Sequence, residues 1–390
     1  GSQTLGGAYS LARTTLGQMA VRIALQCNEQ DSLLILGEDN PAARLLTRPG
    51  EAIYNDAGGL VENNSTFQVV WLGDAVRDRT LERIREKGVR ALGEEVLSPI
   101  VFEGQSPAPA DGNELLEREL ATLAARPSEG LSPVALIGEP LAIKGPTSIE
   151  LRRETGMNVL AVTPQAESAM AMLSLAAVSS VISGGSGSRL VIIDSARKDE
   201  AEYGVWPRLL ASAGAGGASI QHALPDEIEG VFEQLGSELD RRKQGEVGEP
   251  VFVVVYGLHR CTALKAADDG FGGFSFGGSE SEQGHSRGQA SKRFADLLAE
   301  GSEMGMHVLT WCDSASSLER MLGRSGAAHF EARILMQMSQ SDSISLMDAP
   351  AASRLGLHRA LLYHEQSGSQ ERFRPYVRPS TKWVRGLFTS

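Results

Sequence analysis

An apolar stretch at residues 159–162 runs into a short polar turn and then into a long segment rich in Ala, Met and Leu. This order predicts a strand, a tight loop and a helix, which is the setting of a P-loop, G-x-x-x-x-G-K-[ST]. In a P-loop, glycines let backbone N–H groups approach nucleotide phosphates, the Lys neutralises them and the Ser or Thr holds Mg²⁺. The first chemistry to consider in this chain is therefore nucleotide binding.

The residues at the P-loop positions lack that chemistry. Thr163 stands in the place of the first glycine and Ser168 in that of the second. Ala169 replaces the lysine, and Met170 replaces the hydroxyl residue that would bind Mg²⁺. We therefore expect a degenerate nucleotide pocket with no catalytic residue and no metal. Its loop consists of Thr163, Pro164, Gln165, Ala166, Glu167, Ser168, Ala169 and Met170.

Two alternatives remain open at this loop. The carboxylate of Glu167 either repels phosphate or is a plain solvent-exposed loop group. An ATPase that uses non-standard residues would need another cation, because no lysine near the loop replaces Ala169. Lys144 and Lys198 could approach only through the fold.

Composition places the chain among globular proteins with more than one domain. It has 390 residues, a hydrophobic fraction of 42 % and a net charge of −12. This charge argues against a general nucleic-acid binder, which needs clustered Lys and Arg. No apolar run reaches the roughly 18 residues that span a bilayer, and residues 169–182 are better explained as a buried helix.

The cysteines indicate neither a metal site nor a disulfide framework. Cys27, Cys261 and Cys312 are odd in number and far apart in the sequence. A reducing cytoplasm is therefore the expected location. A membrane anchor, if there is one, would lie upstream of this chain.

The pattern of apolar runs predicts an α/β fold. Buried strands are expected at 134–140, 189–194, 250–256 and 306–311, and their alternation with helices indicates a mostly parallel sheet. Helices are expected at 225–243 and 290–301, with a mobile Gly/Ser-rich loop at 267–288. In the first part of the chain we expect strands at 21–26, 52–54 and 67–72, a short helix at 42–46 and a charged helix at 77–87 that stops at Gly88.

The last part of the chain resembles the first. Residues 22–32 align without gaps with residues 333–343, and a Pro-Ala-Ala and an apolar strand follow in both places. The simplest explanation is that residues 1–75 end one module and residues 130–375 form a whole second copy. The nucleotide loop of the first copy would then lie upstream, in a longer multi-module protein.

Taken together, these landmarks resemble the FtsK/SpoIIIE/HerA group of P-loop translocases. The family's Asp-Pro-Lys after a strand is matched by Asp194-Ser195-Ala196-Arg197, and its Glu-x-x-x-Arg-Arg by residues 238–242. Its Gly-Ile-His-Leu strand is matched by residues 305–308, and its closing block by Arg333-Ile334 and Asp342-Ser343. The resemblance implies a RecA-like P-loop NTPase fold with helices on both faces of the sheet.

The departures from the family fall on its catalytic positions. The Walker B pair, Asp-Glu, is replaced by Tyr256-Gly257, which can neither bind Mg²⁺ nor polarise the attacking water. The γ-phosphate-sensing Gln is replaced by Asp313. The resemblance thus adds Asp194, Tyr256, Gly257 and Asp313 to the degenerate pocket.

Several other residues have two interpretations each. Arg22 and Arg333 are either arginines at a ring interface or partners of nearby acids such as Asp342. Tyr256 and Trp311 either line a dry pocket for a partner's side chain or pack in the core. His307 is either functional or a core histidine, and residues 268–288 either touch a partner or are disordered.

The resemblance divides the chain into four parts. We expect the C-terminal part of a preceding FtsK/SpoIIIE-like module at 1–96 and a linker region with a helix at 97–132. A complete degenerate module would follow at 133–378 and a C-terminal tail at 379–390.

The function that follows is a non-hydrolysing module of a larger translocase, serving assembly or binding of a partner. ATP and Mg²⁺ would bind to upstream modules, and this segment would need no cofactor. The chain would assemble into a ring or tandem array and would make no membrane contact itself. The alternatives are part of an ATP-driven DNA translocase ring and a type VII secretion-like protein export ATPase.

Overall fold

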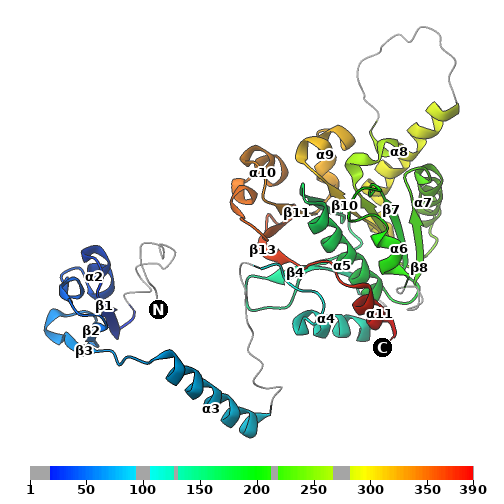
Figure 1. Cartoon of the computed structure of the whole chain (residues 1–390). Coiled ribbons are helices and arrows are strands. Elements are labelled where there is room, and N and C mark those ends of the chain that lie inside the picture. Colours follow the sequence, from blue (N-terminus) through cyan, green and yellow to red (C-terminus); the bar gives the residue numbers. More distant parts are fainter. Residues whose placement is uncertain (1–17, 94–105, 127–130, 212–217, 267–281, 390) are drawn as a thin grey trace. The chain divides into compact units, whose positions relative to one another are not determined.

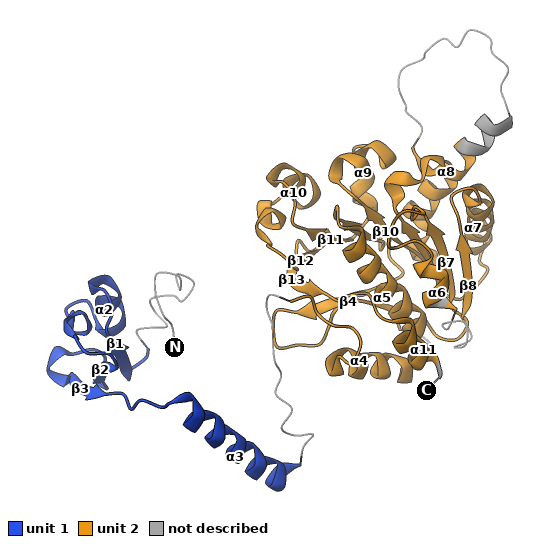
Figure 2. Cartoon of the chain, viewed as in Figure 1, with its two compact units in different colours: residues 1–102 blue, residues 103–390 orange. Residues whose placement is uncertain are grey.

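A computed structural model of the chain describes residues 18–93, 106–126, 131–211, 218–266 and 282–389. The chain forms two compact units, residues 1–102 and residues 103–390 (Figure 2). Each unit has its own sheet and its own apolar core.

Unit 1 contains a three-stranded antiparallel sheet in the order β1-β2-β3. The helix after β1 begins at Asn28, whose side chain accepts a hydrogen bond of 2.8 Å from the Asp31 amide. One face of the sheet packs on this helix through Ala24, Leu36 and Ile53. The elements are β1 Arg22–Leu25, α2 Glu29–Leu36, η1 Ala42–Leu45, β2 Glu51–Asn55, η2 Val61–Asn63, β3 Ser65–Gln68 and α3 Asp74–Leu92.

Two predicted boundaries in unit 1 are wrong. The helix predicted to stop at Gly88 continues to Leu92, because an interior glycine costs a helix only about 1 kcal/mol. It ends at Gly93, where φ is +86°. The strand predicted at 67–72 ends at Gln68, after which the chain has no neighbouring strand in the described part of the unit.

Unit 2 is built on a ten-stranded sheet in the order β5-β4-β13-β12-β11-β6-β10-β9-β7-β8 (Figure 1). The strands from β11 to β8 are parallel, and the four on the other side pair antiparallel. The strands are β4 Val134–Pro140, β5 Thr147–Glu150, β6 Val159–Val162, β7 Arg189–Asp194, β8 Ser219–Ala223, β9 Val251–Tyr256, β10 Met306–Cys312, β11 Ala332–Met336, β12 Ala360–His364 and β13 Gln370–Pro375.

Helices cover both faces of this sheet, because successive residues of its central strands face opposite sides. In β9, Phe252 and Val254 belong to the apolar cluster on one face, while Val253 and Val255 belong to the other. The predicted α/β fold with helices on both faces is confirmed. The helices are α4 Glu114–Ala125, α5 Ala166–Gly184, α6 Val205–Leu210, α7 Ile228–Lys243, α8 Glu282–Glu300, α9 Ala315–Leu322, α10 Gln340–Met347 and α11 Thr381–Thr389, with short 3₁₀ turns between some of them.

The edges of unit 2 differ from the predicted division. The helix α4 was predicted in a linker region, but Leu116, Leu120 and Leu123 are buried in unit 2 together with Tyr376. The predicted tail contains α11, which packs on the same cluster through Trp383. Both helices carry an apolar stripe, and burial of that stripe joins them to the unit.

The predicted mobile loop at 267–288 extends too far towards the C-terminus. Helix α8 begins at Glu282, eight residues before the expected start at Ala290. Residues 267–281, which include most of that predicted loop, lie outside the described residues.

Helix α5 is the central helix of unit 2. It is long and apolar enough to cross a membrane by length and composition, but most of it is buried inside the unit. Its serines bond to strand β4: the hydroxyls of Ser179 and Ser183 accept hydrogen bonds of 2.8 Å from the Leu136 and Val134 amides. The prediction of a buried helix here is confirmed.

His307 lies in the core, in the middle of the sheet. Its Nδ1 lies 2.9 Å from the carbonyl oxygen of Met157, and its ring stacks on Phe252. Burial lowers the pKa of His307 from 6.5 to about 4. The histidine is therefore neutral in the folded protein at neutral pH.

This burial makes stability depend on pH. The folded pKa lies below the unfolded one, so the unfolded chain binds the extra proton, and stability falls as the pH drops from 6.5 towards 4. The full effect of such a shift is about 3 kcal/mol. We expect His307→Gln to flatten the slope of unfolding free energy against pH in urea titrations. An unchanged slope would contradict the prediction.

Candidate functional site

The predicted pocket residues follow neighbouring strands and meet at one edge of the sheet. The strands β7, β9, β10 and β6 are parallel neighbours, and Ser195, Gly257, Asp313 and Thr163 directly follow their carboxyl ends. The carboxyl ends of parallel strands are where open α/β sheets bind ligands. The fold therefore brings together the residues that the sequence analysis placed in one pocket.

The loop after β6 is short. Strand β6 ends at Val162 and helix α5 begins at Ala166, so only residues 163–165 connect them. The Thr163 hydroxyl accepts a hydrogen bond of 3.1 Å from the Gln165 amide, and the Gln165 side chain accepts one of 3.0 Å from Ser168. The loop thus bonds to itself, and its residues do not form a wide turn of free N–H groups.

The start of helix α5 carries no positive side chain. Ala169 and Met170 are completely buried in the apolar core, so neither position can present a charge to a phosphate. Glu167 is exposed in the first turn, where the helix dipole favours a carboxylate. The one charge at this helix end has the same sign as a phosphate.

Two aromatic side chains, one from β10 and one from β9, bond to the loop and to the first residue of α5. The indole N–H of Trp311 donates to the Thr163 carbonyl at 2.8 Å, and the Tyr256 hydroxyl donates to the Ala166 carbonyl at 3.2 Å. The two ring centroids lie 4.7 Å apart, and both side chains are at most 1 % exposed. Core packing is therefore the interpretation that the structure favours, and neither ring lines an open pocket.

Gly257 stands at a position that suits a glycine. Its φ is +85°, which only glycine adopts without strain, and a Cβ there would lie 3.3 Å from Arg260 and 3.4 Å from Ser195. At the position that the resemblance aligns with Walker B, the chain therefore makes a tight turn with no side chain.

Arg260 is a central residue of the site that the sequence analysis missed. Its guanidinium lies 5.2 Å from the Trp311 ring centroid and donates to the Ser195 carbonyl at 3.2 Å. It also forms an ion pair of 2.7 Å with Glu200. Burial raises the pKa of Glu200, but the bonds and charges of Arg260 and Arg197 outweigh burial and leave the pKa below its ordinary value. No local pattern signals this role, because Ser195, Glu200 and Trp311 lie far from Arg260 in the sequence.

Asp194 is already bonded. One carboxylate oxygen accepts the Ala196 amide at 3.0 Å, and the other lies 3.1 Å from Nε2 of His222 on β8. It is only 3 % exposed. The carboxylate therefore shapes the turn after β7 and is not presented to a ligand.

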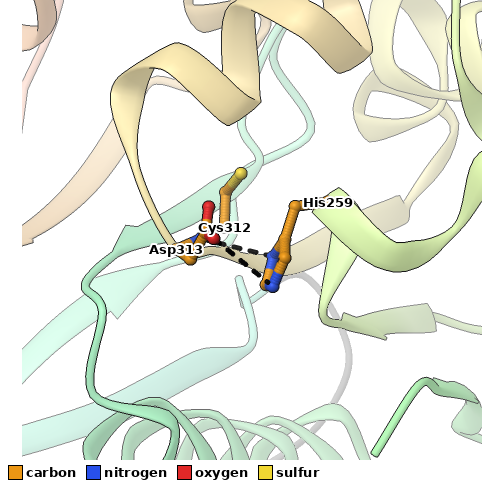
Figure 3. Close-up of side chains that lie close together, drawn as sticks. All are labelled: His259, Cys312 and Asp313. Carbon is orange, nitrogen blue, oxygen red and sulfur yellow. Dashed lines mark hydrogen bonds and ion pairs between the residues drawn. The ribbon is translucent and has the colours of Figure 1, made fainter.

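His259, Cys312 and Asp313 form a cluster whose ligand atoms lie within 4.8 Å of one another (Figure 3). Three observations disfavour a cation there. The Nε of Arg260 donates to Nε2 of His259 at 3.1 Å, burial raises the pKa of the Cys312 thiol to about 12, and the Cys312 sulfur points away from the imidazole. The protonated thiol and the neighbouring guanidinium make this a weak metal site.

The Asp313 carboxylate is bonded to residues at the start of the helix that follows it, α9. Burial raises its pKa, but hydrogen bonds from Ser317 and Ser314 and the nearby His259 and Arg320 outweigh burial and lower it. Burial also lowers the pKa of His259, so at neutral pH this pair is a carboxylate beside a neutral imidazole. Neither group is free to sense a γ-phosphate as a Gln amide would.

Arg333 is bonded within its own unit. It is 4 % exposed, donates to the Leu346 carbonyl at 2.6 Å and pairs with Glu365 at 2.9 Å. The acid partner is thus Glu365 and not Asp342, whose amide is bonded to Ser339 at the start of α10. Arg22 makes the equivalent bond in unit 1, 2.7 Å to the Leu36 carbonyl. Both arginines tie a strand to the end of the following helix.

Lys144 does not substitute for the missing P-loop lysine. It lies between β4 and β5, at the far side of the sheet from the parallel strands, and pairs with Glu371 at 2.6 Å. Lys198 is an exposed residue after β7.

Comparison with known proteins gives a fold match only. No family model and no curated protein matches the sequence. Thermomonospora curvata EccC (ATPases 2 and 3), solved with a signal sequence peptide, has a TM-score of 0.53 at 12 % identity over 96 % of this chain and 67 % of that chain. The coupling protein TcpA of pCW3 conjugation, solved with ATPγS, has a TM-score of 0.48 at 13 % identity over 68 % of this chain and 75 % of that chain.

The cytoplasmic domain of the type VII secretion ATPase EccC from T. curvata is also similar. Its TM-score is 0.48 at 14 % identity over 70 % of this chain, which spans 33 % of that domain. The match to EccC ATPases 2 and 3 confirms the predicted RecA-like P-loop ATPase fold, and with it the resemblance to FtsK/SpoIIIE-like proteins at the level of fold.

The aromatic pair should be important for stability. Trp311→Ala removes a buried ring and leaves the Thr163 carbonyl unpaired, so we expect a loss of about 3–5 kcal/mol in unfolding free energy. Urea unfolding measures it. Trp71→Ala is the control, because Trp71 is 91 % exposed in unit 1. Equal effects of the two substitutions would contradict the role given to Trp311.

Proposed function

We propose that residues 103–390 form a non-hydrolysing module of a larger FtsK/SpoIIIE-like translocase, which serves assembly or binding of a partner. The observation that carries this proposal is the short loop after β6, bonded by Trp311 and followed by a helix start where Ala169 and Met170 are buried and Glu167 is the one charged side chain. The fold of a P-loop ATPase is present, and the groups that hold phosphate and Mg²⁺ are replaced.

Hydrolysis would also need the Walker B Asp, the Walker B Glu and the Gln that senses the γ-phosphate. The three aligned positions hold Tyr256, Gly257 and Asp313. A Walker B site needs an Asp near Mg²⁺ and a Glu that polarises water. The positions hold Tyr256, whose hydroxyl is bonded to the loop, and Gly257, which has no side chain. Asp313 adds negative charge where the γ-phosphate would lie.

Unit 1 supports a tandem arrangement. Its β1 and β2 pair Leu25 with Ala52, as β11 and β12 pair Met336 with Ala360. The helices after β1 and β11 begin in the same way, with the side chain of Asn28 or Ser339 accepting the amide three residues on. We infer that unit 1 is the end of a preceding module and that ATP and Mg²⁺ bind to modules upstream.

The shared pattern extends to the buried serines of both helices. The Ser32 hydroxyl donates to the Asn40 carbonyl and accepts the Ala43 amide. Ser343 makes the same two bonds, to the Ala349 carbonyl and from the Ala352 amide. Equal local bonding at aligned positions is what a duplicated module would retain.

A protein is the substrate or partner that the observations favour over DNA. The structural neighbour EccC (ATPases 2 and 3) was solved with a signal sequence peptide. The net charge of this chain is −12, whereas proteins that track DNA present clustered Lys and Arg. We therefore place the parent protein among protein export ATPases, working in the cytoplasm as a ring or tandem array.

The proposal predicts that this chain does not bind nucleotide. Isothermal titration calorimetry with Mg-ATP and with Mg-ADP should show no binding up to about millimolar concentration, because Ala169 stands at the lysine position and Glu167 is the one charged side chain in the first turn of α5. Micromolar binding would overturn the proposal. Glu167→Gln is a useful companion variant, because removal of the repelling charge should still not create a site.

A DNA-binding assay distinguishes a protein export ATPase from a DNA translocase. Fluorescence anisotropy with a labelled 40-base-pair duplex at low salt should show no binding up to ~10 µM chain. Typical non-specific DNA-binding proteins would bind the duplex at this concentration and salt. Salt-sensitive binding below that concentration would favour the DNA translocase instead. The same titration with a labelled polyglutamate chain controls for non-specific attraction of any polyanion.

A further inference from the structure

The sheet of unit 1 has one buried face and one exposed apolar face. Ile23 and Leu25 of β1 are 54 % and 53 % exposed, and Tyr54 and Phe67 beside them are 36 % and 37 % exposed. These four residues are called the open face below. Ala24, from the opposite face, is 1 % exposed. Apolar residues in such a cluster indicate a surface that binds something.

Unit 2 contains the same three-stranded arrangement with this face covered. The pair Ala52 and Phe67 of unit 1 corresponds in register to Ala360 and Phe373 of β12 and β13. The residues that correspond to the open face are all buried to 4 % exposure or less: Ile334, Met336, Leu362 and Phe373.

What covers the face in unit 2 is a strand and the helix that follows it. Strand β6 pairs parallel to β11, with Ala161 opposite Ile334 and Val162 opposite Leu335. The next element, helix α5, shares an apolar cluster with the four covered residues. The chain itself therefore shows which partner this three-stranded arrangement accepts.

Strand β1 lacks that partner among the described residues, where it pairs only with β2. Edge strands that face solvent are normally protected by charged residues, Pro or a bulge. Apart from Arg22, whose guanidinium is bonded to the Leu36 carbonyl, β1 is apolar. Its free edge has the composition of an interior strand.

We propose that the open face and the free edge of β1 bind a strand–helix unit of the β6–α5 kind, contributed by residues that precede this segment in the same polypeptide. The strand adds parallel to β1, with an apolar residue opposite Ile23. The helix that follows it is apolar on the side that covers Ile23, Leu25, Tyr54 and Phe67. This inference rests on the proposed tandem arrangement and not on the loss of nucleotide chemistry.

The test compares the accessibility of one position in two chains, the full-length polypeptide and the 390-residue segment. Both carry Cys27→Ser, and each receives a single cysteine, either Leu25→Cys on the open face or Leu45→Cys as control. Leu45 is 72 % exposed on η1 and is not part of the open face. The rate of maleimide labelling at the introduced cysteine is read by peptide mass spectrometry.

The expected result is fast labelling of both positions in the 390-residue segment. In the full-length polypeptide, Leu25→Cys should react about tenfold or more slowly, since labelling would require local opening, while Leu45→Cys should be unchanged. Equal rates at Leu25→Cys in the two chains would overturn the proposal.

Slow maleimide labelling of Leu25→Cys in the isolated 390-residue segment would also overturn the proposal. Something other than a preceding strand–helix unit would then cover the open face. Light scattering would identify a second copy of the chain as that cover if the segment is a dimer. Nucleotide binding to unit 2 would overturn the proposed function and leave this result untouched, so the two failures are distinguishable.

Discussion

The hydrogen bond from the Trp311 indole to the Thr163 carbonyl is the contact on which the site depends. It joins strand β10 to the loop after β6, at the place where a P-loop would need freedom to wrap a phosphate. The Tyr256 hydroxyl of strand β9 adds a bond to the Ala166 carbonyl, at the start of α5 directly after this loop. Because the Thr163 carbonyl is buried, breaking the Trp311 bond would leave it unpaired in the core. The loop is therefore fixed by its neighbours and has no need of a ligand to order it.

Much of the fold could be predicted from the sequence because its strands are strongly patterned. The continuous β-branched run at β9 and the apolar run at β10 predict buried parallel strands, and they occupy the centre of the sheet. The helix predicted within residues 97–132 is present, as α4 Glu114–Ala125. Its membership of unit 2 was not predicted, because packing partners such as Tyr376 lie far away in the sequence.

The sequence predicted which residues of the candidate site lie at the same sheet edge, but not which side chains they contact. Motif positions placed Thr163, Asp194, Tyr256 and Asp313 at one sheet edge, since each follows or ends a strand. The roles of Arg260 and His259 depend on side chains from different loops, which no local pattern encodes. Arg333 shows the same limit: its acid partner is Glu365 of the neighbouring strand connection and not the nearer Asp342.

The burial of Ala169 bears on how such a module could evolve. A lysine at this position would place an ammonium group in the core beside Met170 and the aromatic pair, where an unpaired charge is strongly destabilising. A glycine in the loop would not free the backbone, because Trp311 and Tyr256 would still bond to the carbonyls at positions 163 and 166. Under the proposed function, neither of these two substitutions alone would restore a nucleotide site. On the same proposal, a return to nucleotide chemistry would therefore require changes in the loop and at both rings together.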